Sequence, residues 1–370
     1  MHPLPTEYLD GYGFRDGSLA FETRDAKGFE RLRELGGQML TSYGQPGESW
    51  APQVFSVLRK WGVNTYLDAH EIFNIDGQPF WYGGVLCFTG LNNLSHLKKD
   101  GSIGEMIRAF DNMDTTCEET VFFSIYDHPT EFSSSEFWDE CNFAKGRNPF
   151  VYRSVPLRTV EERDALINQY REFINNTSVR PGMEYVTASE AMRYERQRMS
   201  PISTDDLKST VGFCHSEASF VKIGPSWLAP SEMLNLMARY LTGRVLTPEL
   251  LYGPEKEETS VSSKPVKVRE LAEAVFAVHD RVMGYKQLPS LYRIGDQFIN
   301  PADAFCTLAN AINTGETEMM ITRARFAAAD YVNDKFKFGG NWVLWDDTFK
   351  AENIVNQTKR QTWTLKPAVF

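Results

Sequence analysis

Several features of specialised proteins are scarce or missing in this 370-residue chain. It has no run of about 18 apolar residues, which a membrane-spanning helix requires. The first five residues, Met1 to Pro5, have neither the basic nor the apolar region of a signal peptide. If Met1 is the true start, these absences predict a cytoplasmic protein without a membrane span. Lysine and arginine form no block, and the net charge of −10 argues against nucleic acid as a partner.

Cysteine is also scarce. The chain has five cysteines, at Cys87, Cys117, Cys141, Cys214 and Cys306. They are far apart, and no pair has the spacing of metal ligands. An odd number without close pairs favours reduced thiols, and we expect them to serve as small core residues.

The remaining composition is that of a globular protein, with 42% hydrophobic and 24% charged residues. In the first half, strand and helix signals alternate. A strand is predicted over 39–43, a helix from Pro52 to Trp61, and a strand over 63–67. This order predicts a parallel α/β sheet. Further helices are predicted over 25–35 and 160–175, and a last strand over 184–187 is followed by a short helix capped by Ser189.

Residues 121–125 are mostly β-branched or aromatic and nearly uncharged, which predicts a short strand buried on both faces. The strand ends at Asp127-His128-Pro129, because proline cannot continue a central strand. The carboxyl ends of such strands are where α/β folds place their chemistry. His128 is therefore a candidate functional residue. The alternative is a turn aspartate and a histidine satisfied by the backbone.

Aromatic side chains are candidates for stacking on sugar rings. Trp50 lies in a glycine- and proline-rich loop, residues 42–52, that also carries Glu48. Trp81 and Tyr82 follow a tight Asp-Gly turn, and the alternative is that these rings line the core. With Trp227 in the second half, the candidate substrate-binding residues are Trp50, Trp81, Tyr82 and Trp227.

The order of these signals resembles the polysaccharide deacetylase (NodB-homology) family over about residues 2–195. The resemblance is carried by residues 44–47 with 50–53, 63–68, 125–129 and 185–189. It implies a partial (β/α) barrel and a hydrolase acting on the carbon–nitrogen bond of an acetylated glycan. It also implies a divalent metal, zinc, held by one Asp and two His, which lowers the pKa of a bound water.

On this resemblance His2 is the second metal-binding histidine, and His128 is the general acid that protonates the leaving amine. Glu48 and Asp68 are the nearest candidates for catalytic carboxylates, or else a loop glutamate and a helix-capping aspartate. The family's Asp-Asp pair, its first metal histidine and its arginine are missing, and zinc sites need about three protein ligands. We therefore expect an impaired deacetylase that binds zinc weakly or not at all. Either the chain is an N-terminally truncated form of an active barrel, or it has lost the metal. The second hypothesis is a non-catalytic carbohydrate- or cell-wall-binding protein that keeps the barrel as a scaffold.

The second half contains an internal duplication. Residues 201–243 and 265–315 each show a helix, an Ile-Gly-x-x-aromatic hairpin and a second helix, and Ile223-Gly224 matches Ile294-Gly295. One copy is too small to bury a core alone. We therefore expect a joint core of Leu207, Val211, Leu236, Leu271, Val275 and Leu308. Trp227 and Phe298 should be equivalent, and either one is the glycan-stacking candidate if it reaches solvent.

The second copy also resembles pseudomurein-binding-type repeats, through residues 288–290, 294–295 and 301–305. This resemblance implies an acetylated polysaccharide or cell-wall polymer as partner. The alternative is a duplicated helical domain that merely packs on the barrel. The predicted fold is thus α/β, with a partial (β/α) barrel over 1–195, a mainly α duplicated domain over 201–315, and a tail, 316–370, packed on the repeats.

Overall fold

The computed structural model describes residues 5–45, 49–67, 69, 72–75, 79–89, 92–93, 107–108, 120–126, 128–136, 153–197, 201–336 and 349–370. The chain forms two compact units. The first comprises 1–89, 195–338 and 351–370, and the second comprises 90–194 and 339–350. These boundaries differ from the predicted ones, because the first 89 residues belong with the duplicated segments rather than with residues 90–194.

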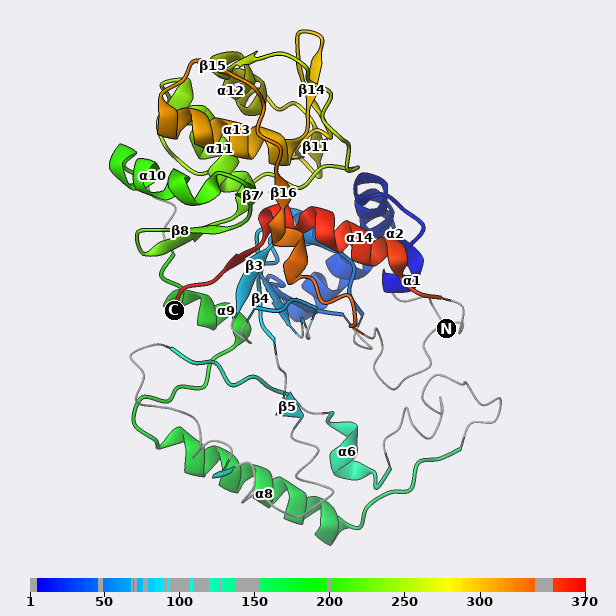
Figure 1. The fold of residues 1–370 in the computed structure, drawn as a ribbon. Coiled ribbons are helices and arrows are strands. Elements are labelled where there is room, and N and C mark those ends of the chain that lie inside the picture. The colour runs from blue at the N-terminus through cyan, green and yellow to red at the C-terminus, as the bar shows by residue number, and fades with distance from the viewer. Residues whose placement is uncertain are drawn as a thin grey trace. The chain divides into compact units, whose positions relative to one another are not determined.

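The first unit contains most of the regular structure (Figure 1). Its elements are α1 (Pro5–Leu9), α2 (Phe14–Gly36), β1 (Ser42–Gly44), α3 (Val54–Lys60), β2 (Thr65–Leu67), β3 (Phe80–Tyr82), β4 (Val85–Cys87), α10 (Thr204–Val211), η3 (Gly212–Cys214), β7 (Glu217–Ala218), β8 (Val221–Ile223), β9 (Ser226–Leu228), α11 (Pro230–Leu241), β10 (Val266–Lys267), α12 (Val268–Phe276), β11 (Arg281–Val282), β12 (Tyr285–Lys286), β13 (Tyr292–Ile294), β14 (Gln297–Ile299), α13 (Pro301–Thr314), β15 (Glu318–Met319), β16 (Arg325–Phe326), η4 (Ala327–Tyr331), α14 (Glu352–Gln361), η5 (Thr362–Thr364) and β17 (Lys366–Pro367).

A five-stranded mixed sheet is built largely from the N-terminal part of this unit, in the order β1-β2-β4-β3-β17. β1 and β2 pair in parallel and are joined through α3, so the predicted strand–helix–strand unit is confirmed. β4 adds a second parallel pairing, whereas β3 and β17 run antiparallel to their neighbours. No barrel is seen among the described strands, and the barrel stays a prediction.

Helix α2 is longer than the sequence predicted. It begins at Phe14 instead of Asp25, and it ends before Gly37, whose φ of 61° is the left-handed conformation that glycine adopts at helix ends. Its N-terminal half is buried through Phe14 and Phe21, whereas Leu32 and Leu35 are exposed. The local pattern therefore marked only the solvent-exposed half of the helix.

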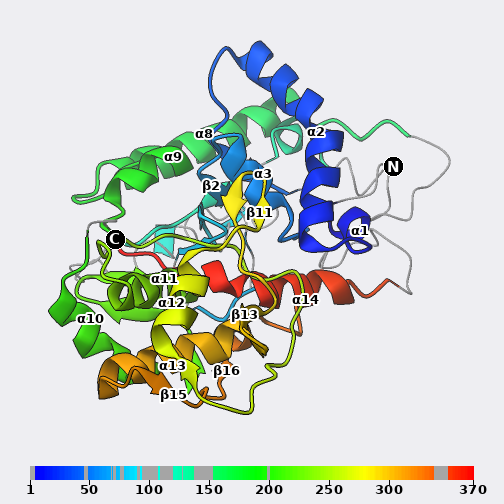
Figure 2. The ribbon, with the colours of Figure 1, turned by 90° about the horizontal axis from the view of Figure 1, so that it is seen from above.

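The two duplicated segments share one arrangement of elements. α10, the β8–β9 hairpin and α11 form the first copy, and α12, the β13–β14 hairpin and α13 form the second, as predicted. The second copy also contains a further hairpin, β11–β12, between its first helix and β13. Figure 2 shows the four helices gathered together, and the first helix of each copy packs on the second helix of the other. This exchange of helices is the arrangement that a pseudo-twofold relationship between the two copies produces.

The predicted joint core is confirmed. All six of its residues are at most 1% exposed and lie in one hydrophobic cluster: Leu207, Val211, Leu236, Leu271, Val275 and Leu308. Trp363 from the tail joins the same cluster and stacks on Phe326, with ring centroids 4.5 Å apart. The tail therefore packs on the repeats, and through β17 it also completes the sheet.

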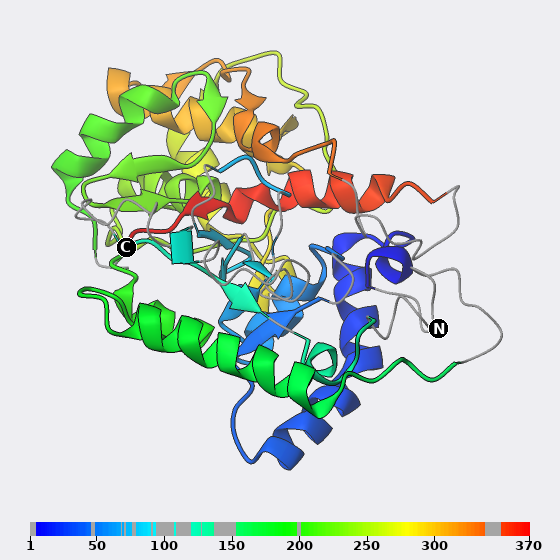
Figure 3. The same cartoon turned by 90° about the horizontal axis from the view of Figure 1, so that it is seen from below.

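The second unit contains β5 (Asn92–Asn93), β6 (Ile125–Tyr126), α6 (Thr130–Ser133), α8 (Val160–Ser178), α9 (Ala188–Ala191) and η2 (Met192–Tyr194). α8 is its longest described helix (Figure 3), and it confirms the predicted amphipathic segment. Thr159 and Glu162 close a capping box at its start. Phe123 and Ile125 pack against Phe173 of this helix.

Two strand predictions in this unit are wrong. Only Ile125 and Tyr126 form a strand, pairing in parallel with β5, and Val121 is 53% exposed instead of buried. Residues 184–187 form no strand, because Thr187 is the N-cap of α9, with its hydroxyl accepting the Glu190 N–H. A capping threonine has extended backbone angles like those of a strand residue, so the local pattern did not separate the two.

Candidate functional site

Three of the predicted site residues, His2, Glu48 and Asp68, lie outside the described residues. In the sequence Glu48 follows β1 by four positions, and Asp68 directly follows β2. Because β1, β2 and β4 are parallel neighbours, their carboxyl ends share one edge of the sheet. This is the edge where open α/β sheets bind ligands.

The described residues at this edge include a buried polar group. Tyr66 donates its hydroxyl to Gln45 Oε1 at 2.9 Å. Gln45 Nε2 and Ser49 Oγ are buried without a hydrogen-bond partner in the described part of the chain. An unpaired buried polar atom costs free energy, so such atoms often mark a site with a further occupant, such as water or a ligand.

Trp50 lies in the core next to this edge rather than on a surface. It is 2% exposed, and its indole N–H donates to Thr358 Oγ1 at 3.0 Å. Its ring packs at 4.9 to 5.4 Å, centroid to centroid, from Phe55, Tyr66 and Tyr82. Its ring has no exposed face for a sugar.

The two β3 candidates differ in exposure. Tyr82 is fully buried, and its hydroxyl donates to the Thr358 carbonyl at 3.1 Å. Burial raises the pKa of Tyr82 well above its ordinary value, so the phenol stays neutral and serves as a structural donor. Trp81 is half-buried and lies opposite Lys366 of β17.

His128 belongs to the second unit. It directly precedes Pro129 and α6, is half-buried, and its ring lies 5.6 Å from that of Tyr126 in an edge-on arrangement. Its placement after β6 agrees with the sequence interpretation, although β6 is only a two-residue strand.

The two hairpins place Trp227 and Phe298 at the same register. Trp227 lies directly opposite Lys222, and Phe298 lies directly opposite Arg293. Gly224 and Gly295 open the two-residue turns with φ of 55° and 61°, as a type II′ turn requires at its first central position. Identical turns fix identical registers, so both hairpins carry an aromatic–cation pair on one face.

The surroundings of the two aromatics are not equivalent. Phe298 is 38% exposed. Val261, which lies between the two copies and is 65% exposed, pairs with Phe298 through two backbone hydrogen bonds of 2.7 and 2.9 Å. Trp227 is less exposed, and Phe220 packs edge-on against its ring at 5.6 Å. The more accessible platform is therefore that of the second copy.

The charges beside the hairpins were not singled out from the sequence. Lys222 and Arg293 are exposed and make no ion pair with any described residue. By contrast, Lys264 near the second hairpin pairs with Asp296 at 2.8 Å. The signal that would have found them is the offset of 71 positions, which relates Lys222 to Arg293 as it relates Trp227 to Phe298.

The described residues leave the zinc expectation untested, because His2, Glu48 and Asp68 lie outside them. The described residues themselves contain no group of three or more His, Cys, Asp or Glu side chains placed to hold a metal ion. Of the histidines in the duplicated segments, His215 is exposed and donates its Nδ1–H to the Gly212 carbonyl at 3.0 Å, and His279 is exposed. Zinc therefore stays an expectation from the family resemblance.

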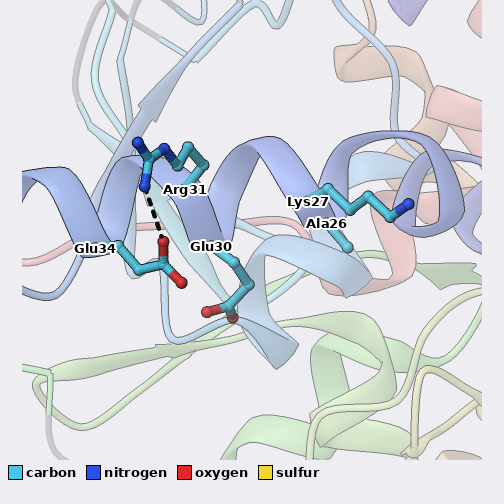
Figure 4. A pocket seen from close by; sticks show the side chains of 5 residues that line it. All are labelled: Ala26, Lys27, Glu30, Arg31 and Glu34. Carbon is cyan, nitrogen blue, oxygen red and sulfur yellow. Dashed lines mark hydrogen bonds and ion pairs between the residues drawn. The ribbon is translucent and has the colours of Figure 1, made fainter.

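A pocket of about 340 Å³ lies along α2, and none of its lining residues is a predicted site residue (Figure 4). It is lined by Ala26, Lys27, Glu30, Arg31 and Glu34, all from this one helix. Arg31 pairs with Glu34 at 3.3 Å, and both side chains are about two-thirds exposed. The pocket is a shallow groove between solvated side chains of one helix surface.

Comparison with protein-family models, curated proteins and solved structures found no match for this chain. The described helices include none that is long and apolar enough to cross a membrane.

Proposed function

We propose that this chain is a non-catalytic carbohydrate-binding protein that holds an acetylated polysaccharide or cell-wall polymer through its duplicated segments. One observation carries the proposal: Trp227 and Phe298 occupy the same register on two equivalent hairpins, with Phe298 reaching solvent beside Val261. An aromatic ring on a short, rigid hairpin offers a flat apolar face at a low cost in entropy.

Sedimentation of the purified chain with insoluble chitin and with bacterial peptidoglycan tests this proposal. We expect Phe298→Ala to weaken retention several-fold, since an aromatic contact contributes about 0.5–1.5 kcal/mol beyond its area. Trp227→Ala should have a smaller effect, because Phe220 already covers part of that ring. The double variant should lose most of the binding.

Phe213→Ala is the matched control, because Phe213 is 81% exposed in the first copy but lies on η3, outside the hairpins. It should leave retention unchanged. Thermal unfolding of each variant separates lost binding from lost structure. Equal retention of Phe298→Ala and the unsubstituted chain would contradict the proposal, as would equal losses for Phe298→Ala and Phe213→Ala.

A second candidate function is hydrolysis of the acetamide carbon–nitrogen bond of an acetylated glycan at the carboxyl edge of β1, β2 and β4. It is favoured by Gln45 Nε2 and Ser49 Oγ, which are buried at that edge and have no hydrogen-bond partner among the residues that the structure describes. Acetate release from N-acetylated chitin oligomers, with and without added zinc, tests it. Activity lost in Asp68→Asn or Glu48→Gln would support this function. Absence of any acetate release would contradict hydrolysis and leave polymer binding as the proposed function.

A further inference from the structure

The two hairpins share a basic residue as well as an aromatic one. In each copy the residue directly opposite the aromatic is basic: Lys222 faces Trp227, and Arg293 faces Phe298. Directly opposed residues of an antiparallel pair project from the same face of the hairpin, with Cβ atoms about 4.5–5.5 Å apart. A ligand stacked on the ring therefore lies within reach of the cation.

Neither of these two cations forms an ion pair within the described part of the chain. Among described residues neither Lys222 nor Arg293 has a carboxylate partner, and both side chains are exposed. Arg293 donates to its own turn carbonyl, Gly295 O, at 3.2 Å, which holds the guanidinium beside the hairpin. The acidic residue nearest in the turn, Asp296, is already paired with Lys264.

Three other cations in or beside the duplicated segments form ion pairs with carboxylates of the protein. Arg244 pairs with Glu273 at 2.9 Å, and Lys286 pairs with Glu249 at 2.8 Å. Arg323 pairs with the buried Asp303 at 3.0 Å. Carboxylates are thus available in this acidic chain, whose net charge is −10. Among the described residues Lys208, Arg269 and Arg281 are exposed without an ion pair as well, so what distinguishes Lys222 and Arg293 is their place directly opposite an aromatic ring.

We infer that the hairpins bind an acidic glycan: the sugar ring stacks on Phe298 or Trp227, and its carboxylate pairs with Arg293 or Lys222. This inference rests on the proposed binding function and adds the chemical class of the polymer. Figure 1 shows β8 and β14 well apart, so each hairpin contacts its own stretch of polymer. Two linked sites strengthen the binding of a long polymer beyond that of either site.

Two soluble oligosaccharides distinguish charge from ring stacking. Chitohexaose is acetylated and neutral, whereas a hyaluronan hexasaccharide is acetylated and carries carboxylates. Titration calorimetry with the full chain should give tighter binding of the hyaluronan hexasaccharide, weakened by raising the salt concentration from 50 to 500 mM. Arg293→Gln should weaken hyaluronan binding roughly two- to fivefold, the range of an exposed charge pair, and leave chitohexaose binding unchanged.

Arg269→Gln is the control, because Arg269 is exposed on α12, outside both hairpins. If both oligosaccharides bind equally and Arg293→Gln behaves like Arg269→Gln, while Phe298→Ala weakens binding several-fold, the acidic class is wrong and the binding function stands. If neither oligosaccharide binds, or Phe298→Ala changes nothing, the binding function fails and the inference fails with it.

Discussion

The ammonium of Lys366 lies 2.9 and 2.8 Å from the two carboxylate oxygens of Glu232, and both side chains are buried, at 7% and 2% exposure. Glu232 also accepts the Ala229 N–H at 2.8 Å, at the start of α11. Lys366 belongs to β17, the last strand of the sheet. One ion pair thus ties the first duplicated segment to the sheet across 134 positions of sequence.

Lys366→Met should destabilise the first unit by about 3–5 kcal/mol, because it leaves the Glu232 carboxylate buried without its counter-charge. Urea unfolding followed by tryptophan fluorescence measures the change. The second copy provides the control: Arg323 pairs with Asp303, the counterpart of Glu232, but its side chain is 54% exposed. Arg323→Met should cost about 1 kcal/mol, since the guanidinium is solvent-exposed and Asp303 keeps two other donors, the Ala324 N–H at 2.8 Å and the Asn300 side-chain amide at 3.3 Å. Equal losses for the two variants would contradict the prediction.

Trp50 should prove structural. Trp50→Ala should cost about 3–5 kcal/mol, as for other buried aromatics, because it removes a 2%-exposed ring and its hydrogen bond to Thr358. Trp50→Phe keeps much of the packing and should cost less. Thermal unfolding measures both variants. A Trp50→Ala variant with unchanged stability but lost polymer binding would contradict this prediction and show that Trp50 contacts the ligand.

The two duplicated segments should fold only together. Leu271→Ala should cost about 2–5 kcal/mol, since Leu271 is fully buried in the joint core. A fragment of residues 201–250 should lack a cooperative thermal transition by circular dichroism, because half of that core lies in the second copy. A fragment that unfolds cooperatively by itself would show that the copies are independent.

The described cysteines should be unreactive in the folded state. Cys87, Cys214 and Cys306 are buried free thiols, as expected from their spacing, whereas Cys117 and Cys141 lie outside the described residues. Burial raises the pKa of Cys214 and Cys306 to about 12, so at pH 8 almost none of the reactive thiolate is present. Iodoacetamide labelling at pH 8, mapped by peptide mass spectrometry, should modify these three only after addition of urea. Rapid labelling of Cys214 in the folded chain would be the contrary result.

The sequence by itself determined the local elements and the duplication. Helical periodicity located α3 and α8, and the repeated Ile-Gly turn located both hairpins and their shared core. These features depend on residues close in sequence, so their spacing carries the signal. The sequence also matched Trp227 with Phe298 at the same distance from the repeated Ile-Gly turn, whereas only the structure showed that Phe298 reaches solvent.

Only the tertiary structure decided which distant segments meet. The pairing of β17 with β3, the ion pair of Lys366 with Glu232, and the burial of Trp50 against Thr358 join residues more than 130 positions apart. Such contacts leave no periodic pattern, since each partner's sequence is also compatible with a surface position. For the same reason the sequence did not place residues 1–89 with the duplicated segments: a compact unit is defined by shared burial, which depends on the whole packed chain.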